Sequence, residues 1–391
     1  MADPYASPTH HRHRQSEKGS KVMETNVPNL VTSPRESTVS FVIVTFNSLR
    51  TISSCLKSVL AQSLTPAQTI IVDNASTDGT LEIVQSFSQS VNLVSLRQNV
   101  GFAAACNIGA KLATGELIAF VNPDAYLSRD WLESLVDYLG RNRNTAAATS
   151  RIYLWKDKNE GTLRFNAEGN QANFLGFAWC RNLGATKPEN EGPVEVIYPS
   201  GAAMVIWKSA FNQAGGFDED LFLYHDDFDL GIRLRLHGWR TVLVPKGAAF
   251  HDYDFSRTPT KLYYLERNRL IVLAKMFRVR TILRILPAFA VCEVAVLLDA
   301  IGKGWFGYKV KSYLGFFQSI QETIRKRRQL MTSRTVSDAT ILSLFAGGIY
   351  HPRVLTSKFA RAFNRFLESY RNAFLTTFSH SSRTDFVGMI R

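Results

Sequence analysis

The first folded part of the chain alternates short apolar runs with amphipathic stretches. Apolar and β-branched residues predict four buried strands, at Val39–Thr45, Gln68–Val72, Asn92–Leu96 and Glu116–Val121. Helical spacing of apolar residues predicts three intervening helices: Ser48–Gln62, one through Leu81 and Val84 that Ser76 would cap, and Phe102–Ala113. Strands and helices that alternate at this spacing form right-handed crossovers, so we expect an α/β domain with a mainly parallel sheet.

Polar residues stand at the carboxyl ends of three of these strands. They are Thr45 and Asn47, Asp73 and Asn74, and Asn122 and Asp124. Ligands of parallel sheets bind beyond the carboxyl ends of the strands. The sequence therefore predicts a ligand site at this edge.

The remainder of the chain is more helical. The stretch 146–246 mixes strands and loops, with a helix at Leu230–His237, and a long helix is expected over Thr258–Arg278. Ile282–Ile301 is strongly apolar but contains Arg284, Pro287, Glu293 and Asp299, so we expect an amphipathic helix at a membrane interface rather than a spanning one. The basic run Arg325–Arg328 suits anionic lipid head groups, although a helical bundle with a solvated basic face is the alternative. Leu355–Phe378 is amphipathic as well.

These patterns divide the chain into three parts. Residues 1–36 are polar, contain a His/Arg cluster and lack the apolar centre of a signal peptide, which predicts a disordered basic tail. Residues 37–278 form the predicted α/β domain, and residues 279–391 form a helical, basic region.

Composition adds two constraints. The net charge of +13 suits an anionic partner, such as nucleotide phosphates, nucleic acid or an acidic membrane face. The four cysteines are scattered without a CxxC pair, which favours a reducing compartment.

Three groups of side chains are candidates for chemistry. Asp124 follows an apolar strand in Asn122-Pro123-Asp124, where its carboxylate could reach Mg²⁺ or Mn²⁺, although the same tripeptide is common in turns. His251 ends a later apolar run and could complete that cation site, or it could be structural.

The third group is an acidic cluster at Asp218–Asp229, which holds six carboxylates in twelve residues. Like charges this close raise one another's pKa, which is useful for a base or a cation site. Asp227 and Asp229 also lie where a helix begins, so helix capping is an alternative role for both.

Taken together, these stretches resemble the family 2 glycosyltransferases, which have the GT-A fold, and in particular their rhamnosyltransferase-like branch. The likeness covers about Val39 to Lys275 and rests on six pieces in order: Val42–Asn47, Val72–Gly79, Asn99–Asn107, Asn122–Asp124, Asp226–Asp229, and His251 followed by Tyr263–Arg269. Two positions depart from the family pattern. Asn122 opens the DxD position, and His225 stands where an aromatic residue is frequent.

The resemblance implies a role for each matching position. Asp227 would be the base that takes the acceptor proton, and His225 and Asp226 would lie on the acceptor side. Asp124 and His251 would bind the divalent cation, Mg²⁺ or Mn²⁺. The donor would be held by Thr45, Asn47, Asp73, Arg97, Asn99, Gly101, Asn107, Asn122, Pro123, Asp124, Gly201 and Ala202. Arg267 or Arg269 could assist in neutralising the leaving diphosphate.

The resemblance also implies the reaction and the partners. It implies an inverting hexosyltransferase that moves a sugar, rhamnose or a related hexose, from a thymidine- or uridine-diphosphate donor to a hydroxyl of a glycan or polyprenyl-linked acceptor. We expect a cytoplasmic protein, peripheral on the inner face of the cell membrane through its C-terminal region.

Three other classes fit less well. A nucleic-acid-binding protein would suit the charge, but zinc-ligand spacing, a helix-turn-helix cue and an RNP-like strand are lacking. A nucleotidyltransferase usually carries a Gly-rich basic loop after the first strand, where this chain has Thr45–Ser48. A membrane scaffold without transfer activity would not need Asp124, Asp227 and His251.

Overall fold

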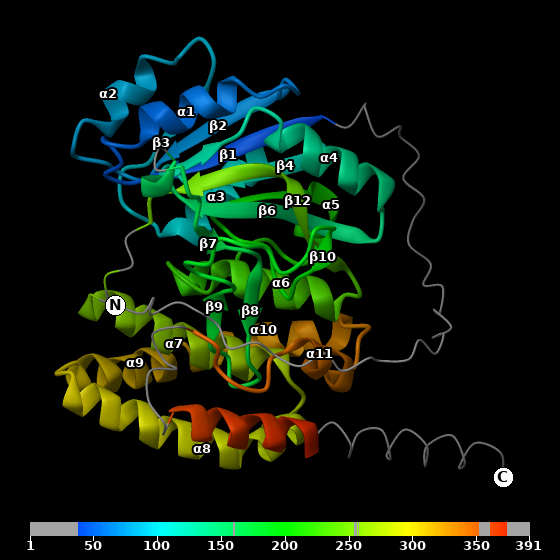
Figure 1. Cartoon of the computed structure of the whole chain (residues 1–391). Coiled ribbons are helices and arrows are strands. Elements are labelled where there is room, and N and C mark those ends of the chain that lie inside the picture. Colours follow the sequence, from blue (N-terminus) through cyan, green and yellow to red (C-terminus); the bar gives the residue numbers. More distant parts are fainter. Residues whose placement is uncertain (1–37, 159–160, 254–255, 257, 352–359, 374–391) are drawn as a thin grey trace.

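A computed structural model describes residues 38–158, 161–253, 256, 258–351 and 360–373. A central sheet with helices on both faces forms one part of the molecule, and a layer of C-terminal helices forms the other (Figure 1). The predicted α/β architecture with a helical C-terminal extension is thus confirmed. The predicted tail, residues 1–36, lies outside the described residues, as do 355–359 and 374–378 of the predicted last helix.

The main sheet is mixed, with the order β10-β12-β6-β11-β4-β1-β2-β3. Parallel pairing joins β4, β1, β2 and β3, and also β6 and β12, whereas β11 runs antiparallel between β4 and β6. The strands are β1 (Val39–Thr45), β2 (Gln68–Asp73), β3 (Asn92–Ser95), β4 (Leu117–Val121), β5 (Ala125–Leu127), β6 (Thr145–Leu154), β7 (Phe165–Ala167), β10 (Val194–Glu195), β11 (Ala203–Trp207) and β12 (Arg240–His251). A separate hairpin consists of β8 (Asn170–Ala172) and β9 (Ala178–Cys180).

The helices in the first part include those predicted from apolar periodicity, and α4 and α5 in addition. They are α1 (Ile52–Leu60), α2 (Thr80–Gln85), α3 (Phe102–Leu112), α4 (Trp131–Arg141), α5 (Lys208–Gln213), α6 (Asp226–Leu236) and α7 (Pro259–Met276). Thr258 caps α7, because its side chain accepts a hydrogen bond from the Lys261 amide.

The predicted cap of α2 is wrong. Gly79 occupies the N-cap position, and the Ser76 hydroxyl instead accepts a hydrogen bond from the Asn47 amide at 3.0 Å. The Asp78 carboxylate stabilises the first turn of α2 instead, because it accepts a hydrogen bond from the Thr80 amide at 3.0 Å. The loop between β2 and α2 is thus longer than predicted, and Ser76 links the loops that follow β1 and β2 rather than beginning the helix.

The C-terminal helices share a second apolar core with α6 and α7. They are α8 (Val279–Gly302), α9 (Phe306–Gln318), α10 (Ile320–Ser333) and α11 (Asp338–Leu344), and residues 360–373 are also helical. Phe228 of α6 and Ile271 of α7 pack in this core with Ile285 of α8 and Leu342 of α11. The start of α8 coincides with the predicted boundary at residue 279, but the core continues across it.

Within the described residues, one helix, α8, is long and apolar enough to cross a membrane by length and composition, which is weak support for a span. One of its faces is buried and carries Ile285, Cys292 and Glu293. Its opposite face exposes apolar side chains, so α8 has apolar residues on both faces, and its place at a membrane interface stays a prediction.

Candidate active site

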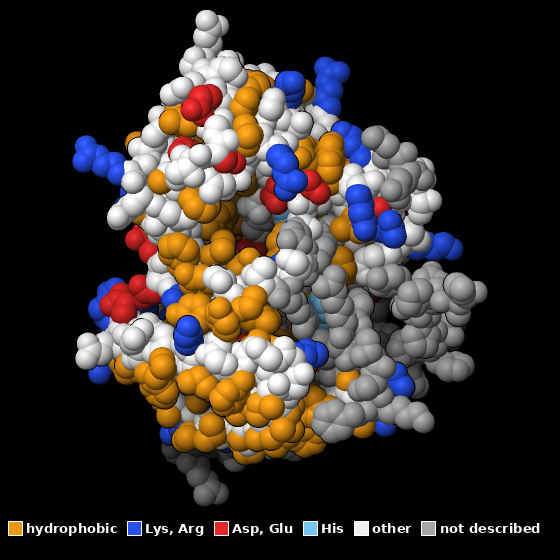
Figure 2. Space-filling model, turned by 90° about the vertical axis from the view of Figure 1, so that its left-hand side faces the viewer, with side chains coloured by type: hydrophobic (Ala, Val, Ile, Leu, Met, Phe, Trp, Pro, Cys, Tyr) orange, Lys and Arg blue, Asp and Glu red, His pale blue; other side chains and the backbone are white. Residues whose placement is uncertain are grey.

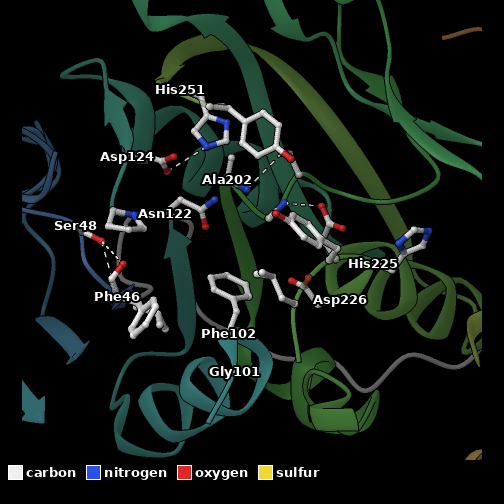
Figure 3. A pocket seen from close by; sticks show the side chains of 18 of the residues that line it. Phe46, Ser48, Gly101, Phe102, Asn122, Asp124, Ala202, His225, Asp226 and His251 are labelled. Carbon is white, nitrogen blue, oxygen red and sulfur yellow. Dashed lines mark hydrogen bonds and ion pairs between the residues drawn. The ribbon is translucent and has the colours of Figure 1, made fainter. Parts of the chain in front are cut away.

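One cavity of about 690 Å³ opens where the carboxyl ends of β1 and β4 meet the start of α6. Loops from distant parts of the chain form its wall. Asp124, Asp227 and His251 all line it, so the three residues predicted to carry the chemistry share one cleft. Figure 3 shows Asn122, Asp124 and His251 on one side, and His225 and Asp226 on another.

Strand register brings Asp124 and His251 together. β5 and β12 pair antiparallel with Ala125 opposite His251, and the Asp252 amide donates to the Asp124 carbonyl at 2.9 Å. The Asp124 carboxylate therefore lies 3.1 Å from the His251 Nε2, although 127 positions separate them in the chain. The imidazole is buried, whereas the carboxylate remains 30% exposed to the cavity.

The donor atoms in this corner suit a divalent cation. In the described part of the chain, no three His, Cys, Asp or Glu side chains are placed to hold one metal ion together, so the acidic and imidazole ligands in this corner are a pair. The Asn122 Oδ1 is buried and, among the described residues, accepts no hydrogen bond. Because an orphaned buried oxygen is costly, an amide oxygen beside a carboxylate and an imidazole fits a hard or borderline cation such as Mg²⁺ or Mn²⁺.

The opposite wall is a strained loop that leads into α6. Phe222, Tyr224 and His225 have φ values of 62°, 67° and 63°. Each residue held in such a conformation costs about 1–3 kcal/mol, and strain of this kind is concentrated at functional sites. The loop delivers Asp226 and Asp227 as the first two residues of α6, where the helix dipole favours negative charge.

Two backbone amides orient the Asp227 carboxylate. Gly201 donates to its Oδ2 at 3.0 Å, and Phe228 donates to its Oδ1 at 2.7 Å. Burial raises the pKa of Asp227 to about 6, and these two hydrogen bonds limit the rise because they favour the ionised form. Burial and the charge of Asp227 raise the pKa of Asp226 as well. Asp227 is thus the member of the pair that ionises first.

His225 is neutral at physiological pH. Burial lowers the pKa of its imidazole to about 4. The ring lines the cavity and lies edge-on to Phe228. It therefore contributes an uncharged polar surface to this wall rather than a third charge.

Amide side chains shape the other end of the cavity. Asn99 Oδ1 accepts from the Asn74 side chain and from the Gly101 amide, both at 2.9 Å. Asn47, with a φ of 51°, accepts from the Thr77 amide at 2.9 Å. These bonds join the loops after β1, β2 and β3 into one surface, which contains Asn47, Asn99 and Gly101 among the predicted donor residues.

Gly101 is required where the two walls meet. Its φ is +88°, and a Cβ atom there would lie 2.5 Å from the Phe222 ring. We expect Gly101→Ala to destabilise the fold by about 2 kcal/mol or more, from backbone strain and overpacking together, measured by urea denaturation. Gly215→Ala is the matched control, because Gly215 has a φ of +84° with open space around it. Equal losses in the two variants would contradict the close contact.

Four predicted donor residues do not line the cavity. Thr45 and Asp73 are buried beneath it, where the Thr45 hydroxyl donates to the Asp73 carboxylate at 2.9 Å. Arg97 is exposed outside it. The Asn107 side chain binds the backbone of Phe217. Thr45 and Asp73 are covered because parallel strands bury the residues within them, whereas Asn107 lies in α3 and Arg97 on the surface.

The structure shows other contacts for Arg267 and Arg269, the two residues expected to assist with the leaving diphosphate. Arg269 is buried and pairs with Glu266 and Glu293. Arg267 donates to backbone carbonyls, including that of Leu221 at 3.2 Å. Neither side chain lines the cavity.

Several cavity residues were missed by reasoning from the sequence. Arg50 lies a few residues beyond the predicted polar strand end, and Tyr253 stacks on His251 with ring centroids 5.3 Å apart. Trp179 and Cys180 come from the β8–β9 hairpin. Tyr253 could have been found from the sequence, because it lies two positions after His251. No sequence pattern pointed to the residues of the β8–β9 hairpin.

The mixed sheet, with the Asp124–His251 pair and the Asp227 carboxylate lining one cavity beyond its strand ends, agrees with the glycosyltransferase resemblance of the sequence. Residues 40–213 match the family model described as Glycosyl transferase family 2, the family that the sequence resembles. This match bears out the predicted family and enzyme class.

One curated relative is the N-acetylglucosaminyl-diphospho-decaprenol L-rhamnosyltransferase of Mycobacterium tuberculosis. It is 29% identical over 232 residues, which are 54% of this chain and 74% of the relative. The predicted likeness to the rhamnosyltransferase-like branch agrees with this match.

Solved structures resemble the chain more distantly. A mannosyltransferase of Pyrobaculum calidifontis, in complex with GDP-Man and Mn²⁺, is 15% identical with a TM-score of 0.47 and covers 88% of each chain. GalNAc-T7 with UDP, GalNAc and Mn²⁺ is 18% identical with a TM-score of 0.49 and covers 61% of this chain and 48% of that one.

Proposed function

We propose that this chain transfers a sugar, rhamnose or a related hexose, from a nucleoside-diphosphate donor to a hydroxyl of a glycan or polyprenyl-linked acceptor. The observation that carries the proposal is the single cavity in which the Asp124–His251 pair and the Asp227 carboxylate line different walls. The acceptor class is supported by the mycobacterial relative, whose name specifies a decaprenol-linked acceptor.

The residues of the two walls divide the chemistry. Asp124 and His251, with Asn122, would hold a divalent cation, which when bound neutralises charge on the diphosphate. Asn47, Asn99 and Gly101 would contact the donor. Gly201 and Ala202 would border the reacting sugar, since a side chain at Gly201 would approach the Asp227 carboxylate.

Asp227 would act as the general base. Its ionised carboxylate takes the proton of the acceptor hydroxyl while that oxygen bonds to the anomeric carbon. The bond from the anomeric carbon to the diphosphate oxygen breaks in the same step, and the electron pair leaves with the diphosphate. A single in-line displacement of this kind inverts the anomeric centre.

Donor binding and product analysis test this function. A thermal-shift panel of nucleoside diphosphates and their sugars, with Mg²⁺ or Mn²⁺, should show stabilisation by a thymidine- or uridine-diphosphate sugar. Transfer to a polyprenyl-diphosphate-linked saccharide should then give a product of inverted anomeric configuration by NMR. The proposal fails if no sugar nucleotide stabilises the protein or is consumed.

The pH profile should report the Asp227 carboxylate. Protonated Asp227 cannot accept a proton, so kcat/KM is low below its pKa and rises as the group ionises. Because burial raises that pKa to about 6, we expect the acid limb near pH 6 rather than near the ~4 of an exposed aspartate. An acid limb with its midpoint at or below pH 4 would contradict the buried base.

We also propose that the exposed apolar face of α8 and α9 rests on an anionic membrane surface. Figure 2 shows apolar side chains gathered over the lower part of the molecule, where these helices lie in Figure 1. The exposed residues that form this face are Val279, Leu283, Leu286, Val291, Val294, Leu298, Ile301, Phe306, Val310, Leu314 and Phe317. Arg280 and Lys311, both exposed, add positive charge on the same helices, which suits acidic head groups.

The predicted lipid contact through Arg325–Arg328 is not supported by the packing. Lys326 forms ion pairs with Asp218 at 2.5 Å and with Asp220 at 2.7 Å. Arg327 donates to the Ala274 carbonyl. These side chains attach α10 to the rest of the protein, so two charges of the basic run are used inside the fold.

Vesicle co-sedimentation tests the membrane face. Leu283 and Leu298 are 62% and 64% exposed, and we expect a Leu283→Glu/Leu298→Glu variant to lose about tenfold or more in binding to anionic phospholipid vesicles. Leu112→Glu is the control, because Leu112 is an exposed leucine of α3. Truncation before α8 is a poor test, since it would uncover the second core. Undiminished binding of the double variant would contradict the proposal.

A further inference from the structure

The loop from Leu221 to His225 is held from behind by one side chain of α7. Asn268 is fully buried, and its amide nitrogen lies 2.9 Å, 2.8 Å and 2.9 Å from the carbonyl oxygens of Leu221, Leu223 and Tyr224. An amide NH₂ has two hydrogens, so one of them is shared. These contacts lie on both sides of Phe222 and on Tyr224, two of the residues whose backbone has a positive φ.

The orientation of the Asn268 amide is fixed by its neighbour. Arg267 Nε donates to Asn268 Oδ1 at 3.0 Å, so the oxygen faces the guanidinium and the nitrogen faces the carbonyls. The side chain can meet all of these contacts only in this orientation.

Ion pairs with the C-terminal helices hold this part of α7 in place. Glu266 and Arg269 flank Asn268, and both are buried. Lys309 of α9 pairs with Glu266 at 2.5 Å, and Glu293 of α8 pairs with Arg269. Helices α8 and α9, which carry the exposed apolar face, therefore hold the part of α7 from which Asn268 contacts the Leu221–His225 loop.

We propose that Asn268 is a positioning residue for sugar transfer, acting through the Leu221–His225 loop on Asp227. The inference rests on the proposed role of Asp227 as base. The loop ends where α6 begins, and the Asp227 carboxylate reaches the Gly201 amide only if α6 begins at that place. The loop also closes the donor side, because the Phe222 carbonyl accepts from the Phe102 amide at 2.7 Å next to Gly101. Asn268 thus fixes both walls relative to each other without lining the cavity.

Two variants and one control test this role. Asn268→Asp removes the donor nitrogen with little change of volume, and Asn268→Ala removes the amide. Ile271→Ala, in the same helix and equally buried but packed in the apolar core, is the matched control for lost stability. We expect both Asn268 variants to lower kcat at least tenfold and to raise KM for the acceptor more than KM for the sugar nucleotide. Ile271→Ala should lower Tm without this difference between the two KM values.

A second measurement does not depend on transfer. Hydrogen exchange of the amides from Phe222 to Asp227 should be at least tenfold faster in the Asn268 variants than in the wild type and in Ile271→Ala. Unchanged exchange in this segment would overturn the proposal, as would unchanged kcat or an equal loss in Ile271→Ala. If the wild type transfers no sugar, the proposed function fails while hydrogen exchange still decides whether Asn268 orders the loop.

Discussion

Asp227→Asn should lower kcat for sugar transfer by about 10³-fold while leaving the dissociation constant for the sugar nucleotide unchanged. The replacement preserves the shape of the side chain but cannot take a proton from the acceptor hydroxyl. The hydrogen bonds from Gly201 and Phe228 go to two different carboxylate oxygens, and the single oxygen of an amide can keep only one of them without rotation. Steady-state kinetics with saturating donor, together with calorimetric donor binding, would separate the two effects.

Asp226→Asn is the comparison that distinguishes the two neighbouring carboxylates. The pKa of Asp226 is raised by burial and by the charge of Asp227, so this group is largely protonated when Asp227 is ionised. A neutral asparagine is a close substitute for a protonated aspartic acid, and we expect a loss of no more than about tenfold. If Asp226→Asn were the more damaging change, Asp227 would not be the base.

The second large effect is expected at the Asp124–His251 pair, which is proposed to bind the cation on the diphosphate. His251→Ala and Asp124→Asn should each weaken Mn²⁺ binding by about 100-fold or more, because loss of an outer-shell partner alone costs 10–100-fold and these side chains are proposed as direct ligands. Transfer should fall with it, and chelation of the metal in the wild type should have the same consequence, reversed by adding Mn²⁺. Titration followed by electron paramagnetic resonance, with and without nucleoside diphosphate, measures the affinity.

Asp137→Asn provides the matched control for this pair. Asp137 lies on the exposed face of α4, where it pairs with Arg141 at 2.8 Å. Asp137→Asn therefore removes one negative charge, as Asp124→Asn does, but at a position that does not line the cavity. An Mn²⁺ affinity in His251→Ala equal to that of the wild type would show that the imidazole only orients Asp124. Equal losses in Asp137→Asn would show a general effect of charge.

The apolar face of α8 and the buried ionic cluster beneath it lie on opposite sides of the same helix. Glu293 is buried and pairs with Arg269 and Lys309, whereas Leu283 and Leu298 point outward. A helix that buries charge on one side and exposes leucine on the other is suited to a boundary between protein and lipid rather than to the interior of either. The proposed membrane contact therefore uses the face of α8 that does not pack against the protein core.

The sequence by itself determined the parts of the site that short chain segments encode. Strands β1, β2 and β4 follow from their apolar runs, and Asp124 follows from its place directly after one of them. The order of the motifs was enough to predict the family, and the family match over residues 40–213 agrees with it. Local periodicity works here because a buried parallel strand needs an unbroken apolar run, whatever the rest of the fold is.

Only the tertiary structure decided which polar residues reach the cavity. Thr45 and Asp73 sit at strand ends like Asn122, yet they bind each other beneath the surface. Asn268 is separated by 47 positions from Leu221 in the loop that it holds, and its function depends on where α7 packs against α6. The register of β5 against β12 places His251 beside Asp124, and contacts between segments this distant are set by packing of the whole chain, which local sequence patterns do not contain.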